Sequence, residues 1–144
     1  MKKFAGLILL FVLMTGCKQE IKQADLVGLN GYWEIEEVIL PDGSKKDYTI
    51  NTTVDYFQLD KLAGIRKKVM PQLDGTYLAN DLVENFTISE KEGTWTVVYK
   101  TPYNTWKETL LTLDAESLIF QHENGIKYIY KKSTGFSLKD EKKI

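Results

Sequence analysis

The feature that most constrains the fold is an alternation of apolar and polar residues that continues from Gly31 to Lys132. Successive side chains of a β-strand point to opposite faces, so a period of two predicts strands with one buried face. In the segment 31–40 this period places Trp33, Ile35 and Ile39 on one face, and Tyr32, Glu34, Glu36 and Val38 on the other. No stretch of this region has a helical period, which argues against a parallel βαβ architecture.

Turn-forming residues divide this region into short strands. We expect strands at about residues 31–40, 46–50, 54–59, 64–70, 82–89, 94–101, 105–113, 117–122 and 126–132. The strongest turn signal is Asn124-Gly125, because both residues tolerate the positive φ that a type I′ hairpin requires. Residues 60–81 are less regular: 60–63 is compatible with one helical turn, and Pro71 with an edge or a bulge.

Eight to ten sequential strands joined by tight turns predict an all-β fold. The expected architecture is an antiparallel up-and-down meander closed into a small barrel, because closure removes unpaired strand edges. A two-sheet sandwich is the alternative. Residues 25–30 are expected to form one capped turn leading into the barrel, and residues 133–144 a polar C-terminal tail.

The N-terminal residues have the pattern of an export signal. Lys2 and Lys3 are followed by a mostly apolar run, 4–14, whose eleven residues are too few to span a bilayer, which takes about 20. The run ends in the segment 13–17, Leu-Met-Thr-Gly-Cys, which resembles the lipobox of bacterial lipoproteins. An ordinary signal peptide with an incidental cysteine is the alternative.

The lipobox resemblance implies that residues 1–16 are a removed signal peptide and that Cys17 carries a diacylglyceryl group and an N-terminal acyl chain such as palmitate. Residues 17–25 would then tether the domain to the bacterial cell envelope, at the periplasmic or surface face of the outer membrane. One acyl chain anchors a protein only marginally, whereas two or three anchor it stably. The mature chain would lose two of its 19 basic residues and keep 20 acidic ones, a net charge of −3.

Composition excludes several classes of function. The balance of 19 basic and 20 acidic residues provides no basic field for a nucleic-acid partner. One cysteine and one histidine are too few for a structural zinc site or an internal disulfide. No nucleophile motif accompanies the serines, so we expect no enzyme activity, no cofactor and no metal.

Gly31-Tyr32-Trp33 opens the first expected strand, and this G-x-W behind a lipobox resembles the lipocalin-like lipoproteins common in Bacteroidota. The resemblance covers about residues 26–132 and implies a lipocalin-like barrel whose interior holds a small apolar molecule, without a catalytic set. In lipocalins the Trp closes the barrel floor and a late Arg packs across it, and this sequence offers only Lys131 and Lys132 there. The second lipocalin signature, a late Thr-Asp-Tyr turn, is missing.

Aromatic residues on the expected inner faces are the candidate ligand-binding residues. They are Trp33, Phe86, Tyr99, Trp106, Phe120 and Tyr128. Filling the core is the simpler role for such side chains, since small barrels are usually packed by their own inward residues.

Charged residues offer fewer candidates. Glu37 has the inward parity of Trp33, so it either faces the barrel mouth or is buried. If it is buried, Arg66, Lys68 or Lys100 could pair with it, and such an interior cation would suit a fatty-acid carboxylate. Otherwise the cluster 66–68, Arg-Lys-Lys, is expected to be a solvated strand edge. Surface or structural roles are expected for His122, Asp55, Asp60, Asp74, Asp81 and Glu84.

These features predict a monomeric, lipid-anchored protein that binds a small hydrophobic ligand. The alternative is a protein-binding accessory or inhibitor module that uses an exposed loop or sheet face. A full interior and a single surface patch of tyrosines would favour that alternative; the tyrosines in question are Tyr32, Tyr48, Tyr56, Tyr77 and Tyr103.

Overall fold

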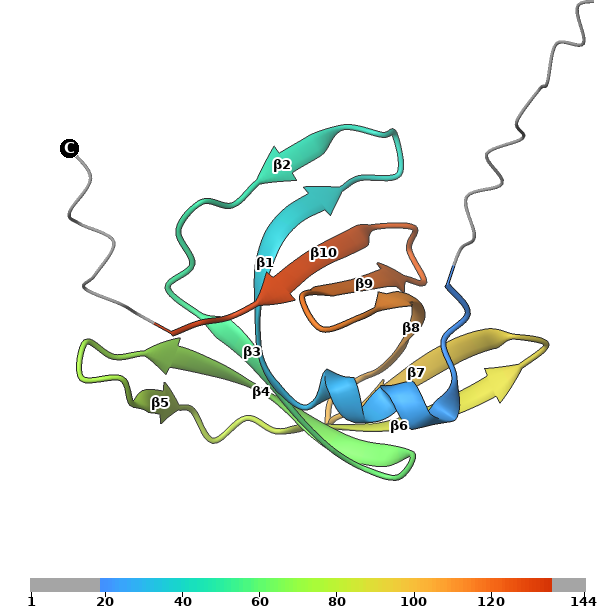
Figure 1. The fold of residues 1–144 in the computed structure, drawn as a ribbon, viewed down its shortest axis with the longest axis horizontal. Coiled ribbons are helices and arrows are strands. Elements are labelled where there is room, and N and C mark those ends of the chain that lie inside the picture. The colour runs from blue at the N-terminus through green and yellow to red at the C-terminus, as the bar shows by residue number, and fades with distance from the viewer. Residues whose placement is uncertain (1–18, 136–144) are drawn as a thin grey trace, which may run out of the picture.

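The computed structural model describes residues 19–135, which form one 3₁₀-helix and ten antiparallel strands (Figure 1). The elements are η1 (Gln23–Leu29), β1 (Gly31–Ile39), β2 (Lys45–Asp47), β3 (Val54–Asp60), β4 (Ala63–Pro71), β5 (Tyr77–Ala79), β6 (Glu84–Lys91), β7 (Thr94–Lys100), β8 (Thr105–Leu113), β9 (Ser117–His122) and β10 (Lys127–Lys132). The expected signal peptide and Cys17 lie outside the described residues. Within the described residues, no helix is long and apolar enough to cross a membrane.

Eight of the strands form a closed ring. Neighbouring strands follow the order β1, β3, β4, β6, β7, β8, β9 and β10, and β10 pairs with β1 from Trp33↔Lys132 to Ile39↔Lys127. The predicted all-β meander of eight to ten strands, closed into a barrel, is therefore confirmed, and the sandwich alternative is wrong.

The two remaining strands are halves of interrupted barrel strands. β10 pairs with one side of β1, and β2 and β3 both pair with the other side. Residues 48–53 separate β2 from β3, so the two short strands together occupy one strand position beside β1. In the same way β5 and β6 share one side of β4 and are separated by residues 80–83. The sequence pattern predicted one strand at 82–89 and missed β5.

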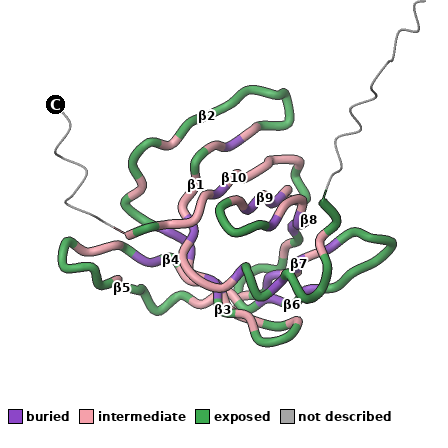
Figure 2. The backbone as a smooth tube through the Cα atoms, viewed as in Figure 1, coloured by how far each residue is buried: buried purple, intermediate pink, exposed green. Residues whose placement is uncertain are grey.

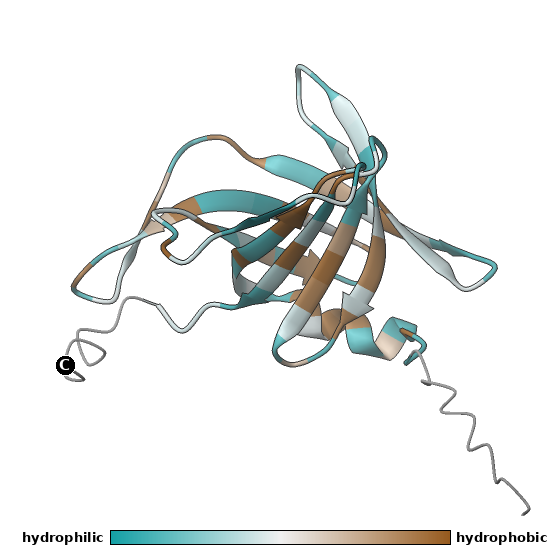
Figure 3. Cartoon of the chain, turned by 90° about the horizontal axis from the view of Figure 1, so that it is seen from above, coloured by the Kyte–Doolittle hydropathy of each residue, from teal (hydrophilic) through white to brown (hydrophobic). Residues whose placement is uncertain are grey.

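The lower half of the barrel interior is filled by the inward faces of the strands. The buried side chains lie on the barrel strands and the exposed residues gather at the hairpin ends (Figure 2), while hydrophobic and hydrophilic bands alternate along the strands (Figure 3). The core comprises Leu26, Leu29, Trp33, Phe57, Phe86, Ile88, Trp95, Val97, Tyr99, Leu110, Leu113, Leu118, Phe120 and Tyr130. The predicted pairing of alternate residues on one face is confirmed in β6, β7 and β9.

The helix η1 closes one end of the barrel. Its Leu26 and Leu29 are 1% and 0% exposed, and it packs against β3 and β8. These two strands lie on opposite sides of the ring of eight, so the helix crosses the floor. The turn expected at 25–30 is thus a longer 3₁₀-helix that begins at Gln23.

A bulge in β1 corrects the predicted faces of that strand. The register shifts between Ile35 and Glu37, and the extra residue of a bulge reverses the alternation beyond it. Val38 is therefore buried at 8% exposure, not Ile39. The carboxylate of Glu37 lies 3.4 Å from the ammonium group of Lys45 on β2, and the Lys45 side chain is 61% exposed. The alternative in which Glu37 is buried and paired with an interior cation is therefore wrong.

Two predicted turns also differ from the structure. The hairpin at Asn124-Gly125 is present, but only Gly125 has a positive φ, +90°, and its amide donates to the carbonyl of His122 at 2.8 Å. A type I′ turn needs a positive φ at both central residues, so that assignment is wrong. Residues 60–63 form the tight β3–β4 turn with Lys61 at φ +57°, not a helical turn.

Candidate ligand-binding site in the barrel interior

Two adjoining cavities occupy the upper half of the barrel, at the end away from η1. Their volumes are ≈ 270 and ≈ 250 Å³, and they share the wall residues Ile35, Lys68, Tyr128 and Tyr130. The larger cavity is also lined by Trp33, Val38, Tyr48, Asn51, Thr53, Val54 and Asp55, and the smaller by Arg66, Trp106, Glu108 and His122. The interior is therefore not completely filled by its own side chains.

The six aromatic candidates divide into two groups. Trp33, Trp106 and Tyr128 line the cavities. The other three, Phe86, Tyr99 and Phe120, are at most 3% exposed and pack in the core below. The structure thus brings half of the predicted set to the cavity walls and gives the other half the core-filling role.

The barrel floor is built around Trp33. Its indole Nε1 donates to the carbonyl of Leu29 at 2.8 Å, and the Lys132 ammonium lies 4.3 Å from the ring centroid. Lys132 also donates to the carbonyl of Asn30 at 2.7 Å, and desolvation lowers its pKa. Gly31 has φ +113°, and a Cβ there would lie 3.0 Å from the Lys132 Nζ. Lys132 therefore occupies the position across the Trp at which the family resemblance implies an Arg.

Arg66 lies inside the barrel, so its predicted place on a solvated edge is wrong. Its side chain is 8% exposed, and its Nε forms an ion pair with Glu84 on β6. Its Nη1 lies 3.6 Å from Glu108 Oε1, and its guanidinium lies 4.2 Å from the centroid of the Tyr99 ring. Arg66 is thus an interior cation, but it pairs with Glu84 and Glu108 and not with Glu37.

Asp55 is also buried, which corrects its predicted surface position. It is 3% exposed, and its Oδ1 lies 2.7 Å from Lys68 Nζ. Its Oδ2 accepts a hydrogen bond from the Tyr130 hydroxyl at 2.8 Å, and burial together with Asp55 raises the pKa of Tyr130 well above its usual value. Glu84 is partly buried against Arg66 rather than solvated.

Glu108 is the residue that sequence reasoning missed. It is 5% exposed, and its Oε2 has no hydrogen-bond partner among residues 19–135. Burial raises the pKa of Glu108, although Arg66 and His122 oppose that shift. Glu108 lies between Trp106 and Leu110, which were predicted to share the inward face of one strand. The same alternation indicates that Glu108 also faces inward.

The remaining titratable groups have structural roles. His122 Nδ1 accepts a hydrogen bond from the amide of Asn124 at 3.1 Å, which agrees with the predicted structural role. The Tyr99 hydroxyl is buried and has no hydrogen-bond partner in the described part of the chain. No group of three or more potential metal ligands occurs between residues 19 and 135.

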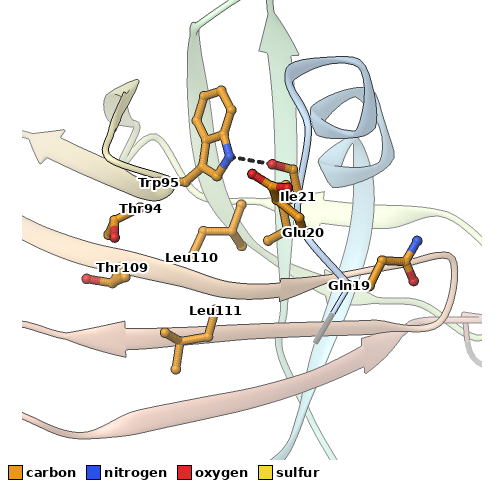
Figure 4. A pocket seen from close by; sticks show the side chains of 9 residues that line it. Gln19, Glu20, Ile21, Thr94, Trp95, Thr109, Leu110 and Leu111 are labelled. Carbon is orange, nitrogen blue, oxygen red and sulfur yellow. Dashed lines mark hydrogen bonds between the residues drawn. The ribbon is translucent and has the colours of Figure 1, made fainter. Parts of the chain in front are cut away.

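A third cavity, of ≈ 280 Å³, lies outside the barrel near its floor (Figure 4). Its walls are the segment 19–21 on one side and β7 and β8 on the other. The indole Nε1 of Trp95 donates to the carbonyl of Ile21 at 2.8 Å, and Ile21 packs against the core. This bond holds the start of the domain at the closed end of the barrel.

Several apolar side chains are exposed in separate loops and strand ends at the open end of the barrel. Of the described residues, the large apolar side chains that are exposed there are Leu40, Ile50, Met70, Leu73, Leu78, Leu82 and Tyr103, and Val27 on η1 is exposed at the floor. We call these seven residues the apolar rim. They belong to the loops and strand ends at the end of the barrel opposite η1.

Three of the five tyrosines considered for a surface patch pack together on the outer side of the barrel, so the predicted patch is present only in part. The Tyr32 ring stacks on the Tyr77 ring with centroids 3.9 Å apart, and the Tyr56 ring centroid lies 4.9 Å from that of Tyr32. Tyr48 lines the larger cavity instead, and Tyr103 is 90% exposed on the β7–β8 loop.

The ring of eight strands, the helical floor beneath Trp33 and the interior cavities give the chain a lipocalin-like barrel fold, which is the fold that the G-x-W resemblance implied. Similar solved structures include a lipocalin-like protein from Bacteroides uniformis, with 16% identity, 74% of this chain and 99% of that chain covered, and a TM-score of 0.46. An uncharacterized protein from Bacteroides eggerthii has 14% identity, coverage of 73% and 99%, and a TM-score of 0.46. Lobster apocrustacyanin A1 has 11% identity, coverage of 83% and 68%, and a TM-score of 0.47. No protein-family model and no curated protein sequence matches the chain.

Proposed function

We propose that the chain is a lipid-anchored, non-enzymatic lipoprotein of the bacterial cell envelope that binds a small hydrophobic ligand inside its barrel. The observation that carries this proposal is the pair of adjoining cavities beneath the barrel mouth. Their shared wall includes Ile35 and Tyr128, and Trp106 adds an aromatic surface on one side. Concave sites with aromatic and apolar walls and a few polar groups are the usual form of small-molecule sites.

The place of the N-terminal segment supports the anchored arrangement. Ile21 is held by Trp95 at the closed end, so a lipid on Cys17, four residues earlier, would draw the floor toward the membrane. The mouth, at the opposite end, would then stay accessible to a ligand.

Native mass spectrometry of the purified protein, combined with extraction of bound lipids, tests whether a small molecule is carried. Ile35→Trp places a large ring in the wall shared by both cavities, so it should remove the bound molecule or an added apolar fluorophore. Ile119→Trp, on the outward face of β9, is the matched control and should leave binding unchanged. Equal binding by both variants would contradict an interior site.

Incorporation of radiolabelled palmitate tests the anchor. The intact protein should take up the label, and Cys17→Ala should not, because the substitution removes the sulfur that accepts the diacylglyceryl group. Equal labelling of the two would refute lipidation at Cys17.

The apolar rim favours a second candidate, a module that binds another protein at the barrel mouth. In that case Leu73→Ser combined with Leu78→Ser would abolish a specific cross-linked complex in the envelope, whereas Ile35→Trp would leave it intact. The opposite pattern would assign the complex to the ligand-bound interior.

A further inference from the structure

Five charged side chains lie in or beside the barrel interior, and we call them the interior charged cluster. They are Asp55, Arg66, Lys68, Glu84 and Glu108. Two of the three acids have their own cation: Arg66 Nε pairs with Glu84, and Lys68 Nζ lies 2.7 Å from Asp55 Oδ1. Three acids against two bases leave Glu108 as the acid without a cation of its own.

Glu108 is also without hydrogen bonds in the described part of the chain. Its Oε2 has no partner, and its Oε1 lies 3.6 Å from Arg66 Nη1, which is beyond hydrogen-bond distance. A carboxylate that is 5% exposed has lost most of its water, so a state without donors is unfavourable. The side chain nevertheless lines the ≈ 250 Å³ cavity, where a bound molecule can supply the missing donors.

We infer that the ligand carries a primary ammonium group that donates hydrogen bonds to Glu108. This inference rests on the proposed function, because it assigns chemistry to the same interior site. Trp106 and Tyr128 line the same cavity, and aromatic faces attract cations. An ammonium bound there would direct the apolar part of the ligand past Ile35 toward Val38 in the adjoining cavity.

The same geometry disfavours a fatty-acid carboxylate as the ligand. Arg66 already faces two acids, Glu84 and Glu108, and Lys68 is paired with Asp55. A ligand carboxylate would add a fourth negative charge beside two cations, whereas an ammonium group gives three charges of each sign. The other titratable groups around Glu108 are His122, Tyr99, Tyr128 and Tyr130.

Three linear probes of ten carbons each test the inference: decylamine, decan-1-ol and decanoic acid, titrated into the purified protein at neutral pH by calorimetry. The wild-type protein should bind decylamine about tenfold more tightly than decan-1-ol, because a charge-assisted hydrogen bond to a buried carboxylate is added. Decanoic acid should bind more weakly than decan-1-ol. Tighter binding of the acid than of the amine would overturn the inference.

Glu108→Gln keeps the size of the side chain and removes its charge. It should reduce decylamine binding about tenfold relative to decan-1-ol, so that the variant binds the two probes with similar affinity. Glu123→Gln removes an exposed acid at the mouth and should preserve the preference for the amine. An unchanged preference in Glu108→Gln, or an equal loss in Glu123→Gln, would overturn the inference. Binding of decan-1-ol without an amine preference would overturn the inference alone, whereas binding of none of the probes would overturn the proposed function too.

Discussion

At the scale of single residues, Gly64 on β4 has the least room for a side chain among the described glycines. A Cβ there would clash with the backbone carbonyl of Gln58 and lie 2.7 Å from Cζ of Phe86. Since backbone atoms cannot move aside cheaply, we expect Gly64→Ala to lower the free energy of unfolding by about 1–3 kcal/mol. Gly28 has no atom within 4 Å of its ideal Cβ, so Gly28→Ala should change stability by less than about 0.5 kcal/mol in the same urea titration.

Lys132 is the second residue with a large expected effect. Lys132→Met keeps an apolar stem but loses the hydrogen bond to Asn30 and the contact with the Trp33 ring, so we expect a loss of about 1–3 kcal/mol. Lys131→Met removes only a half-exposed ion pair with Glu34 and should cost less than about 1 kcal/mol. Urea unfolding followed by tryptophan fluorescence measures both. Equal losses would mean that the floor does not depend on the Lys132 ammonium.

The residues of the floor and those of the interior cluster differ in how far the sequence predicts them. The G-x-W motif predicts the place of Trp33 in the floor, and the position of Lys131 and Lys132 late in the last strand predicts a lysine across it. Arg66 and Glu108 do not, because a charged residue within an alternating strand normally faces solvent, and only a partner on another strand reveals that it faces inward. The pairing that decides their orientation is set by contacts distant in the sequence.

At the scale of elements, the bulge in β1 determines which side chains at the end of that strand face inward, and the result is opposite to that expected from simple alternation. Val38 points into the larger cavity beyond the bulge, whereas Ile39 pairs with Lys127 and is only partly buried. Val38→Asp should therefore lower the free energy of unfolding by about 2–4 kcal/mol, and Ile39→Asp by less than half of that. Thermal unfolding of both variants is the measurement. A larger loss for Ile39→Asp would place the bulge elsewhere.

Strand boundaries follow closely from the sequence where a strand is continuous and has one buried face. The expected segments 105–113 and 117–122 match β8 and β9 residue for residue. The pattern fails at β5, three residues long with no buried side chain, because such a strand exists only through its pairing with β4. The bulge of β1 could not be predicted from the sequence for the same reason, because a register shift is defined only relative to a partner strand.

At the scale of the whole molecule, the buried acid makes stability depend on pH. The pKa of Glu108 is raised from its ordinary 4.5 in the folded state, so the folded protein holds this proton more tightly than the unfolded chain. The stability of the unliganded protein relative to Glu108→Gln should be greatest below about pH 4.5 and decline as pH rises through the folded pKa. Urea unfolding of both proteins between about pH 4 and pH 8 measures the difference. A difference independent of pH would show that the pKa of Glu108 is the same in the folded and unfolded states.

The pairing of β1 with β10 has one more consequence. Because the first and last strands are neighbours, no strand pair in the ring depends on where the chain begins. The barrel is therefore suited to circular permutation. A linker could join residue 135 to residue 19, and new termini could be placed in the exposed β6–β7 turn at Glu92-Gly93. Such a rearranged chain would keep all of its strand pairs, but its ends would leave from a different hairpin.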